Sequence, residues 1–311
     1  MLVPPPRHSF RGVGLVFSIA FSSSGQWLGF SCVGGAVEVW DAAGTKRRAK
    51  RPVPPDADPY EKRHLLAVPG TEQFALTFKA VPELVEAATL KSVAVMTPSA
   101  ATAMRHTVSA LAAFPDGRLV TGHKNGAARV WAPSTGKAER RTFDAHIGGP
   151  KWAKEIRHLA VMPGGERLVT LHDNGGAVVI WDVATRKCLH VITNASGWIF
   201  ALHPSGAVLV TTDGGKVSAH HLPSGVEFAR HSLGRKGVPQ GGKDSLGLLV
   251  TGDRVYVSDG DGKVSSFPLE EDGWPAAPPG NVAGQAGVLA LSPDGRVLAS
   301  IDSGQVALYD L

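Results

Sequence analysis

The chain is built from a repeating unit, and this feature limits the folds open to it more than any other. Each unit has a short apolar run, a turn of Pro or Ser with Gly, and a second run ending in small hydroxyl residues. The clearest copy is 108–122, and relatives lie at 156–170, 198–212 and 288–300. Two apolar runs joined by a tight turn are typical of a β-hairpin. We therefore expect an all-β fold made of similar units.

A third predicted strand follows each hairpin and ends in an aromatic or similar anchor residue. In two weaker units His220 and Phe267 take this position, where we expect His220 to pack or form a hydrogen bond. The anchors and the acidic residues that follow them are Trp40, Asp41, Trp131, Trp181, Asp182, His220, Phe267, Tyr309 and Asp310. The gap between the first two aromatic anchors is about twice the usual interval, which predicts one further unit between them.

We assign the segment 65–98 to this hidden unit. Its 65–70 stretch matches the first strand and turn, and 74–78 matches the second strand, but the aromatic ending is missing. Val81, Leu84, Val85 and Ala88 follow helical spacing, which offers a helix as the alternative. The length of the gap equals one unit and favours strands.

The Trp-Asp endings, the Pro-Asp-Gly turn at 115–117 and the Gly before the aromatic residue resemble the WD-repeat family of β-propellers. The resemblance implies a single domain, a seven-bladed β-propeller of four-stranded antiparallel blades. The approximate units are 15–50, 64–98, 106–143, 156–192, 197–233, 244–279 and 286–311 with 7–13. The segment 7–13 is expected to supply the outer strand of the last blade and so close the ring, because a closed ring leaves no template for aggregation.

The polar residues that often link the aromatic anchor to neighbouring strands in this family are scattered here. Family repeats often carry Gly-His before the first strand and Asp in the second turn, bonded through Ser or Thr to the Trp. In this chain Asn125 and Asp261 lie near the Asp position, while Gly34, Gly214 and Ser303 replace it elsewhere. We therefore expect apolar packing to stabilise most blades.

Basic residues cluster just after the third strand of several units, in a chain with a formal net charge of +5. We call this set the basic rim: Lys46, Arg47, Arg48, Lys50, Arg51, Lys137, Arg140 and Arg141. Its plain interpretation is solvent-facing charge on outer strands, where charge discourages edge pairing. The alternative is a surface for nucleic acid or an acidic partner, with weak polyanion binding at low salt.

Two long connections between units are candidates for binding a partner protein. The first includes His146, Lys151, Trp152 and Lys154, and the second begins with Arg235 and Lys236. Trp is enriched among the residues that dominate protein interfaces, so Trp152 is the expected anchor. The alternative is that Trp152 folds back onto its own blade.

No motif in the sequence predicts catalysis, a cofactor or a metal site. The stretch 29–33 fails the Gly-x-Ser-x-Gly pattern at its last position, and Asp259 and Asp261 fit a tight turn better than a calcium loop. His123 and His172 occupy equivalent places in different units and lack a second ligand nearby, so they read as turn or network residues.

These observations favour an interaction protein over an enzyme. We predict a non-enzymatic scaffold or adaptor that binds a partner protein through the propeller face and loops, a monomer on its own within a larger complex. The alternatives are a nucleic-acid-associated module using the basic rim and, less favoured, a propeller enzyme. The sequence has no apolar run of membrane-spanning length, and Cys32 and Cys188 suit buried thiols, so we expect a cytoplasmic protein that does not insert in membranes.

Overall fold

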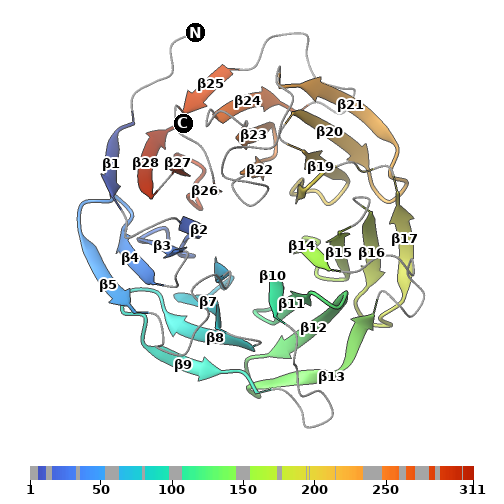
Figure 1. Cartoon of the computed structure of the whole chain (residues 1–311), viewed down its shortest axis with the longest axis horizontal. Helices are drawn as coiled ribbons and strands as arrows, with labels where there is room; N and C mark the ends of the chain where they lie inside the picture. The colour runs from blue at the N-terminus through green and yellow to red at the C-terminus, as the bar shows by residue number, and fades with distance from the viewer. Residues whose placement is uncertain are drawn as a thin grey trace.

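The chain folds into seven four-stranded antiparallel sheets set around a central axis like blades (Figure 1). This computed structural model describes residues 6–11, 16–32, 36–52, 63–78, 81–97, 107–144, 155–173, 177–193, 195, 197–213, 215–233, 247–258, 264–269, 280–283, 288–302 and 304–311. The predicted all-β, seven-bladed propeller is confirmed.

The blades are numbered along the chain, and the strands of each run outward from the centre of the ring. Blade 1 contains β2 (Val16–Phe21), β3 (Trp27–Cys32), β4 (Val37–Asp41) and β5 (Arg47–Arg51). Blade 2 contains β6 (Leu65–Ala67), β7 (Gln73–Phe78), β8 (Val81–Glu86) and β9 (Ser92–Val95). Blade 3 contains β10 (Val108–Ala113), β11 (Leu119–His123), β12 (Ala127–Ala132) and β13 (Lys137–Asp144). Blade 4 contains β14 (Ile156–Val161), β15 (Arg167–His172), β16 (Val178–Asp182) and β17 (Cys188–Ile192).

The remaining blades follow the same order. Blade 5 contains β18 (Ile199–Leu202), β19 (Val208–Thr212), β20 (Lys216–His221) and β21 (Glu227–Ser232). Blade 6 contains β22 (Leu248–Val250), β23 (Arg254–Ser258), β24 (Val264–Pro268) and β25 (Gly280–Ala283). Blade 7 contains β26 (Val288–Leu291), β27 (Val297–Asp302), β28 (Gln305–Asp310) and, from the other end of the chain, β1 (His8–Arg11).

The N-terminal strand closes the ring, as predicted. β1 pairs antiparallel with β28, with His8 opposite Leu308 and Arg11 opposite Gln305. The guanidinium of Arg7 adds an ion pair with Asp310 at 2.9 Å. Blade 7 is thereby completed by the segment that leads directly into blade 1.

The hidden unit is blade 2, and the segment for which a helix was the alternative is its third strand. Val81–Glu86 pairs along its length with β7, so the helix suggested by the spacing of apolar residues is wrong. Val85 lies opposite Phe74, the register position at which Trp131 faces Leu119 in blade 3. Val85 is completely buried there. The apolar residues of this segment can have helical spacing because a middle strand is buried on both faces, so apolar and polar residues need not alternate along it.

The core is a ring of apolar clusters, and among the described residues each cluster is shared by two adjacent blades. Gly122 shows how closely neighbouring sheets approach, since a Cβ at this position would lie 2.6 Å from the side chain of Ile156 in blade 4. Burial of apolar area between sheets stabilises the domain, and no separate hydrophobic centre is needed.

The two ends of the ring differ in how the chain passes through them. At one end, which we call the connection end, the outer strand of each blade leads to the inner strand of the next. At the other, the turn end, lie the turns from first to second strand and from third to fourth. The topology places Asp144 and Glu155 at the connection end, and Asp116 and Lys137 at or beside the turn end.

Candidate functional site

The anchor residues occupy one register position in six blades. Each faces a buried apolar residue of the second strand, as Trp40 faces Leu28 and Tyr309 faces Leu298. The others in this position are Trp131, Trp181, His220 and Phe267. These residues lie within the blades, so they stabilise the strands that support a binding surface and do not themselves form that surface.

The acidic residues after the anchors hold the turns that follow. Asp182 accepts hydrogen bonds from the backbone N–H and the hydroxyl of Thr185 at 2.7 and 2.6 Å, and these bonds lower its pKa. Asp41 is held in the same way by Thr45 at 2.8 Å; burial alone would raise its pKa, but these bonds lower it. Asp310 instead pairs with Arg7. Such bonds fix turns and are typical of Asx motifs.

Polar networks link the Trp anchors of blades 3 and 4 to the second strand. The indole Nε1 of Trp181 donates to Thr170 Oγ1 at 2.9 Å, and this hydroxyl is 2.9 Å from Nε2 of His172. Blade 3 repeats the arrangement with Trp131, Thr121 and His123, at 2.8 and 2.9 Å. All six side chains are buried. In these two blades apolar packing is therefore not the whole of the stabilisation.

The polar anchors of blades 5 and 1 have different hydrogen-bond partners from those of blades 3 and 4. In blade 5 His220 takes the Trp position, and its Nε2 lies 3.3 Å from Thr211 Oγ1, the hydroxyl equivalent to Thr121. In blade 1 that hydroxyl is replaced by Phe30, and Trp40 Nε1 donates to Glu38 at 3.1 Å. A buried indole N–H needs an acceptor, so each blade that carries one of these polar anchors supplies a partner.

Three residues of the basic rim, Arg47, Lys50 and Arg51, are paired with buried carboxylates. Glu38 is fully buried and accepts from Arg47 at 3.2 Å, with Lys50 at 4.0 Å. Arg51 reaches across to Glu83 of blade 2 at 2.9 Å. These cations neutralise carboxylates that would otherwise be buried without a counter-charge, which is strongly unfavourable. Cys32 lies near Glu38, and burial together with this carboxylate raises the pKa of its thiol to about 12.

The remaining rim residues face solvent or lie outside the described side chains. Lys46 and Lys137 are exposed at the start of an outer strand, a position that Lys91 and Lys187 share in blades 2 and 4. Arg48 lies over the ring of Trp27, with Cζ 5.2 Å from the centroid. The backbone of Arg140 and Arg141 belongs to β13, and their side chains are outside the description.

The predicted partner-binding residues lie outside the residues that the structure describes. These are His146, Lys151, Trp152, Lys154, Arg235 and Lys236. The described chain on either side shows where their connections are attached: one leaves at Asp144 and returns at Glu155, and the other leaves at Leu233 and returns at Gly247. Both pairs of attachment points lie at the connection end, because each joins an outer strand to the next inner strand.

The return point at Glu155 is fixed by polar contacts. Its carbonyl oxygen accepts the N–H of Asp173 at 2.9 Å, and Asp173 forms a two-point pair with Arg157 at 2.7 and 2.9 Å. His158 follows on the same inner strand and meets Phe200 of blade 5 edge to face at 4.8 Å. Burial lowers the pKa of His158 to about 4, so its imidazole is neutral near pH 7.

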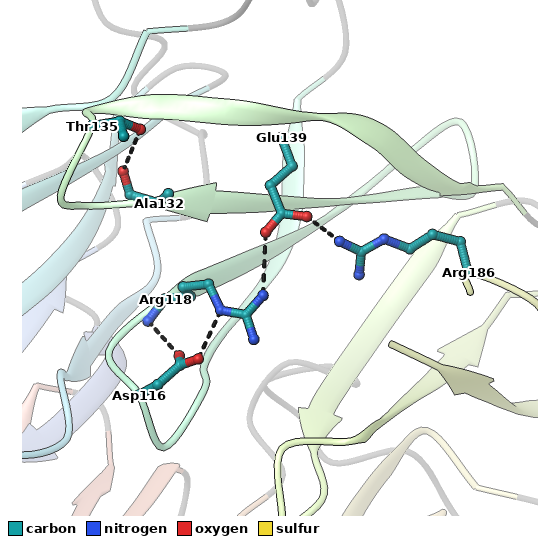
Figure 2. A network of polar contacts seen from close by, with 6 residues as sticks. All are labelled: Asp116, Arg118, Ala132, Thr135, Glu139 and Arg186. Carbon is teal, nitrogen blue, oxygen red and sulfur yellow. Dashed lines mark hydrogen bonds and ion pairs between the residues drawn. The ribbon is translucent and has the colours of Figure 1, made fainter. Parts of the chain in front are cut away.

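A charged network at the turn end joins blades 3 and 4, and sequence reasoning missed it. Figure 2 shows Glu139 between two guanidinium groups, Arg118 at 3.2 Å and Arg186 of the next blade, while Arg118 also binds Asp116 at 2.8 Å. Arg186 has a left-handed φ of 62°, at the turn position that Gly136 and Gly225 occupy in neighbouring blades. Its guanidinium lies 4.5 Å from the ring of Phe143, and these contacts offset the backbone strain.

The described residues contain no group of three or more His, Cys, Asp or Glu able to hold a metal ion. His123 and His172 each bind a threonine in their own blade and are not brought together. In the part of the chain that the structure covers, no helix is long and apolar enough to cross a membrane.

Comparison with known families identifies one repeat directly. Residues 5–41 match the family model described as WD domain, G-beta repeat. This segment covers β1 in blade 7 and the three inner strands of blade 1, so the repeat in sequence is offset by one strand from the blade in space. A search of curated proteins finds none that matches the sequence. The repeat match and the closed ring of seven four-stranded blades together support assignment of the chain to the WD-repeat β-propeller family.

Proposed function

We propose that the chain is a protein-interaction scaffold that binds its partner at the connection end. WD-repeat propellers are generally interaction scaffolds, and they are typically non-enzymatic. The main support for the proposal is that buried polar side chains form hydrogen bonds inside the blades. Thr121, Thr170 and Glu38 each link strands within their own blade, and His123 and His172 bind the two threonines. A ring whose buried polar groups in blades 1, 3 and 4 are engaged within the blades suits presentation of a surface.

The binding surface we propose includes the two long connections. Trp152 is the anchor, with His146, Lys151 and Lys154 beside it in the sequence and with Arg235 and Lys236 in the second connection. An indole buries a large area while its N–H still finds an acceptor, which explains why Trp so often dominates interfaces. The lysines would guide an acidic partner during encounter.

The experiment is affinity purification of partners with the tagged full chain, followed by quantitative binding of the purified partner. Trp152→Ala should weaken binding by tens-fold, roughly the effect of losing an interface anchor, and leave the melting temperature nearly unchanged. Val226→Ala, at an exposed position in a turn of blade 5, is the matched control and should change neither. A lowered melting temperature with normal binding would make Trp152 a structural residue, and absence of any specific partner would contradict the scaffold proposal.

A second candidate function is weak binding of polyanions by exposed lysines beside the outer strands, two of which, Lys46 and Lys137, belong to the basic rim. Four consecutive blades place a lysine at the start of the outer strand, namely Lys46, Lys91, Lys137 and Lys187. All four are exposed, and no ion pair engages them among the described residues. Such an array supports salt-dependent attraction to an anionic surface without reading bases.

A further inference from the structure

The outer strand of blade 2 differs from the outer strands on either side. β5 reads RRAKR and β13 begins KAERR, whereas β9 reads SVAV and carries no charge. Val93 and Val95 are 48% and 54% exposed, among the most exposed large apolar residues described. Charged residues on a sheet edge normally block pairing with another chain. β9 lies on the perimeter of the ring without this protection (Figure 1).

The backbone of β9 presents hydrogen-bonding groups outward. Met96 N–H donates to the carbonyl oxygen of Pro82 in β8 at 3.0 Å. Residues of an antiparallel strand alternate between facing the partner and facing away, so the N–H and C=O of Val95 point away from β8. Among the described residues no strand pairs with Val95 on that side.

Two residues further on, the same edge already accepts a strand-like partner. Thr97 N–H donates to Gly136 O at 2.8 Å, and Ala138 N–H donates to Thr97 O at 3.3 Å, which forms a parallel bridge between Thr97 and Lys137. The outward groups of Thr97 are therefore used by blade 3. This pairing shows that the edge has a geometry suited to main-chain hydrogen bonds, and it leaves the stretch 92–95 open in the described structure.

Lysines stand at both ends of this open stretch. Lys91 precedes Ser92, and Lys137 is bridged to Thr97; both side chains are exposed and neither forms an ion pair within the described part of the chain. Antiparallel pairing of β9 with β9 of a second copy would bring Lys91 of one copy toward Lys137 of the other. Like charges at this spacing oppose self-association, and acidic residues in the same places would favour binding.

We propose that β9 binds an extended segment of a partner protein as a fifth strand of blade 2. The segment has β-branched or apolar residues in the middle and acidic residues at both ends. Main-chain bonds to Val95 would hold it, contacts with Val93 and Val95 would favour its apolar residues, and Lys91 and Lys137 would select its acidic ends. The inference rests on the scaffold function proposed above, and it adds a second binding surface away from the connection end.

The test uses the full chain and a labelled probe peptide, DEVTVTVED, with KKVTVTVKK as the charge-reversed control. Fluorescence anisotropy should show saturable binding of the acidic peptide and at least about tenfold weaker binding of the basic one. Val95→Pro removes the outward N–H without removing a bond to β8, and proline is tolerated at such edge positions. This variant should bind the acidic peptide at least about tenfold more weakly at an unchanged melting temperature.

Two further variants test the roles of the Val95 N–H and of the two lysines separately. Val95→Thr retains the N–H and the β-branched shape and should bind within about twofold of the unmodified chain. The double variant Lys91→Glu with Lys137→Glu should reverse the preference between the peptides, and it gives an answer even if Val95→Pro unfolds. Equal binding of both peptides, absence of binding at millimolar peptide, or an unchanged preference in the double variant would overturn the proposal. A partner that binds Val95→Pro normally and Trp152→Ala poorly would overturn only this inference and leave the scaffold function standing.

Discussion

Phe10 of β1 stacks on Trp40 of β4, with the ring centroids 4.3 Å apart. Phe10 belongs to the strand that completes blade 7, and Trp40 is the anchor of blade 1. The closing strand therefore links the two blades, because it pairs with β28 inside blade 7 while its Phe10 contacts the anchor of blade 1. Gly44 leaves room for the contact, since a Cβ there would lie 2.6 Å from the ring of Phe10.

Removal of this contact should loosen the closure. We expect Phe10→Ala to lower the free energy of unfolding by about 2 kcal/mol, less than for a fully buried Phe because the ring is only half-buried. Thermal melting and urea denaturation measure the effect. Ser9→Ala, on the exposed neighbouring position, is the control and should change little. Equal stability of Phe10→Ala and the unmodified chain would mean that main-chain pairing alone closes the ring.

The Trp–Thr–His networks should contribute measurably to blades 3 and 4. Thr170→Val keeps the shape of the side chain but removes the acceptor of the buried Trp181 indole N–H and one hydrogen-bond partner of His172. An unsatisfied buried polar group costs about 1–3 kcal/mol, so we expect a loss of stability in that range. Thr135→Val removes an exposed hydroxyl as the control. A Thr170→Val protein as stable as the original would show that the hydroxyl contributes nothing beyond packing.

Stability should fall in mild acid because of His158. Its pKa is lowered by burial to about 4, whereas an unfolded histidine has a pKa of about 6.5. Between these values the unfolded chain binds a proton and the folded chain does not, so stability present above pH 6.5 is lost as the pH falls toward 4. This residue accounts for at most about 3 kcal/mol of that loss.

The measurement compares denaturation of the unmodified chain and His158→Gln across this pH range. Burial also lowers the pKa of His220 and His231, and both proteins share those contributions. The difference between the two proteins should therefore isolate His158, with the variant losing less stability. Parallel pH profiles would contradict the assignment.

The exposed lysines should produce weak, salt-sensitive retention on heparin. Reversal of Lys46, Lys137 and Lys187 to Glu should abolish retention at low salt, because counterion release drives such binding. Replacement of the same residues by Arg preserves the charge and should preserve retention. Arg47 is a poor choice for reversal, since it neutralises the buried Glu38 and its loss would destabilise blade 1. Retention of the Glu variant at the original salt concentration would assign the effect to other cations.

The sequence by itself determined the repeating hairpins, the number of units and the closing strand. These depend on local rules: the short apolar runs of 108–122 form strands, the Pro-Asp-Gly of 115–117 forms the turn, and the chain length holds seven such units. The missing aromatic residue in blade 2 did not prevent the prediction of strands, because Val85 fills the same buried position. Its helix-like spacing was ambiguous because a middle strand is apolar on both faces.

Only the tertiary structure decided which polar residues meet. Glu38 has the sequence context of an ordinary strand residue, yet in the folded chain it is completely buried and paired with Arg47 of the adjacent outer strand. Glu139 binds Arg118 in its own blade and Arg186 in the next, and no local spacing links the three. The same holds for the open edge at Val95, whose exposure depends on what lies beside blade 2. Periodicity fixes which face of a strand is apolar, but contacts between blades depend on how separate sheets pack, which no single segment encodes.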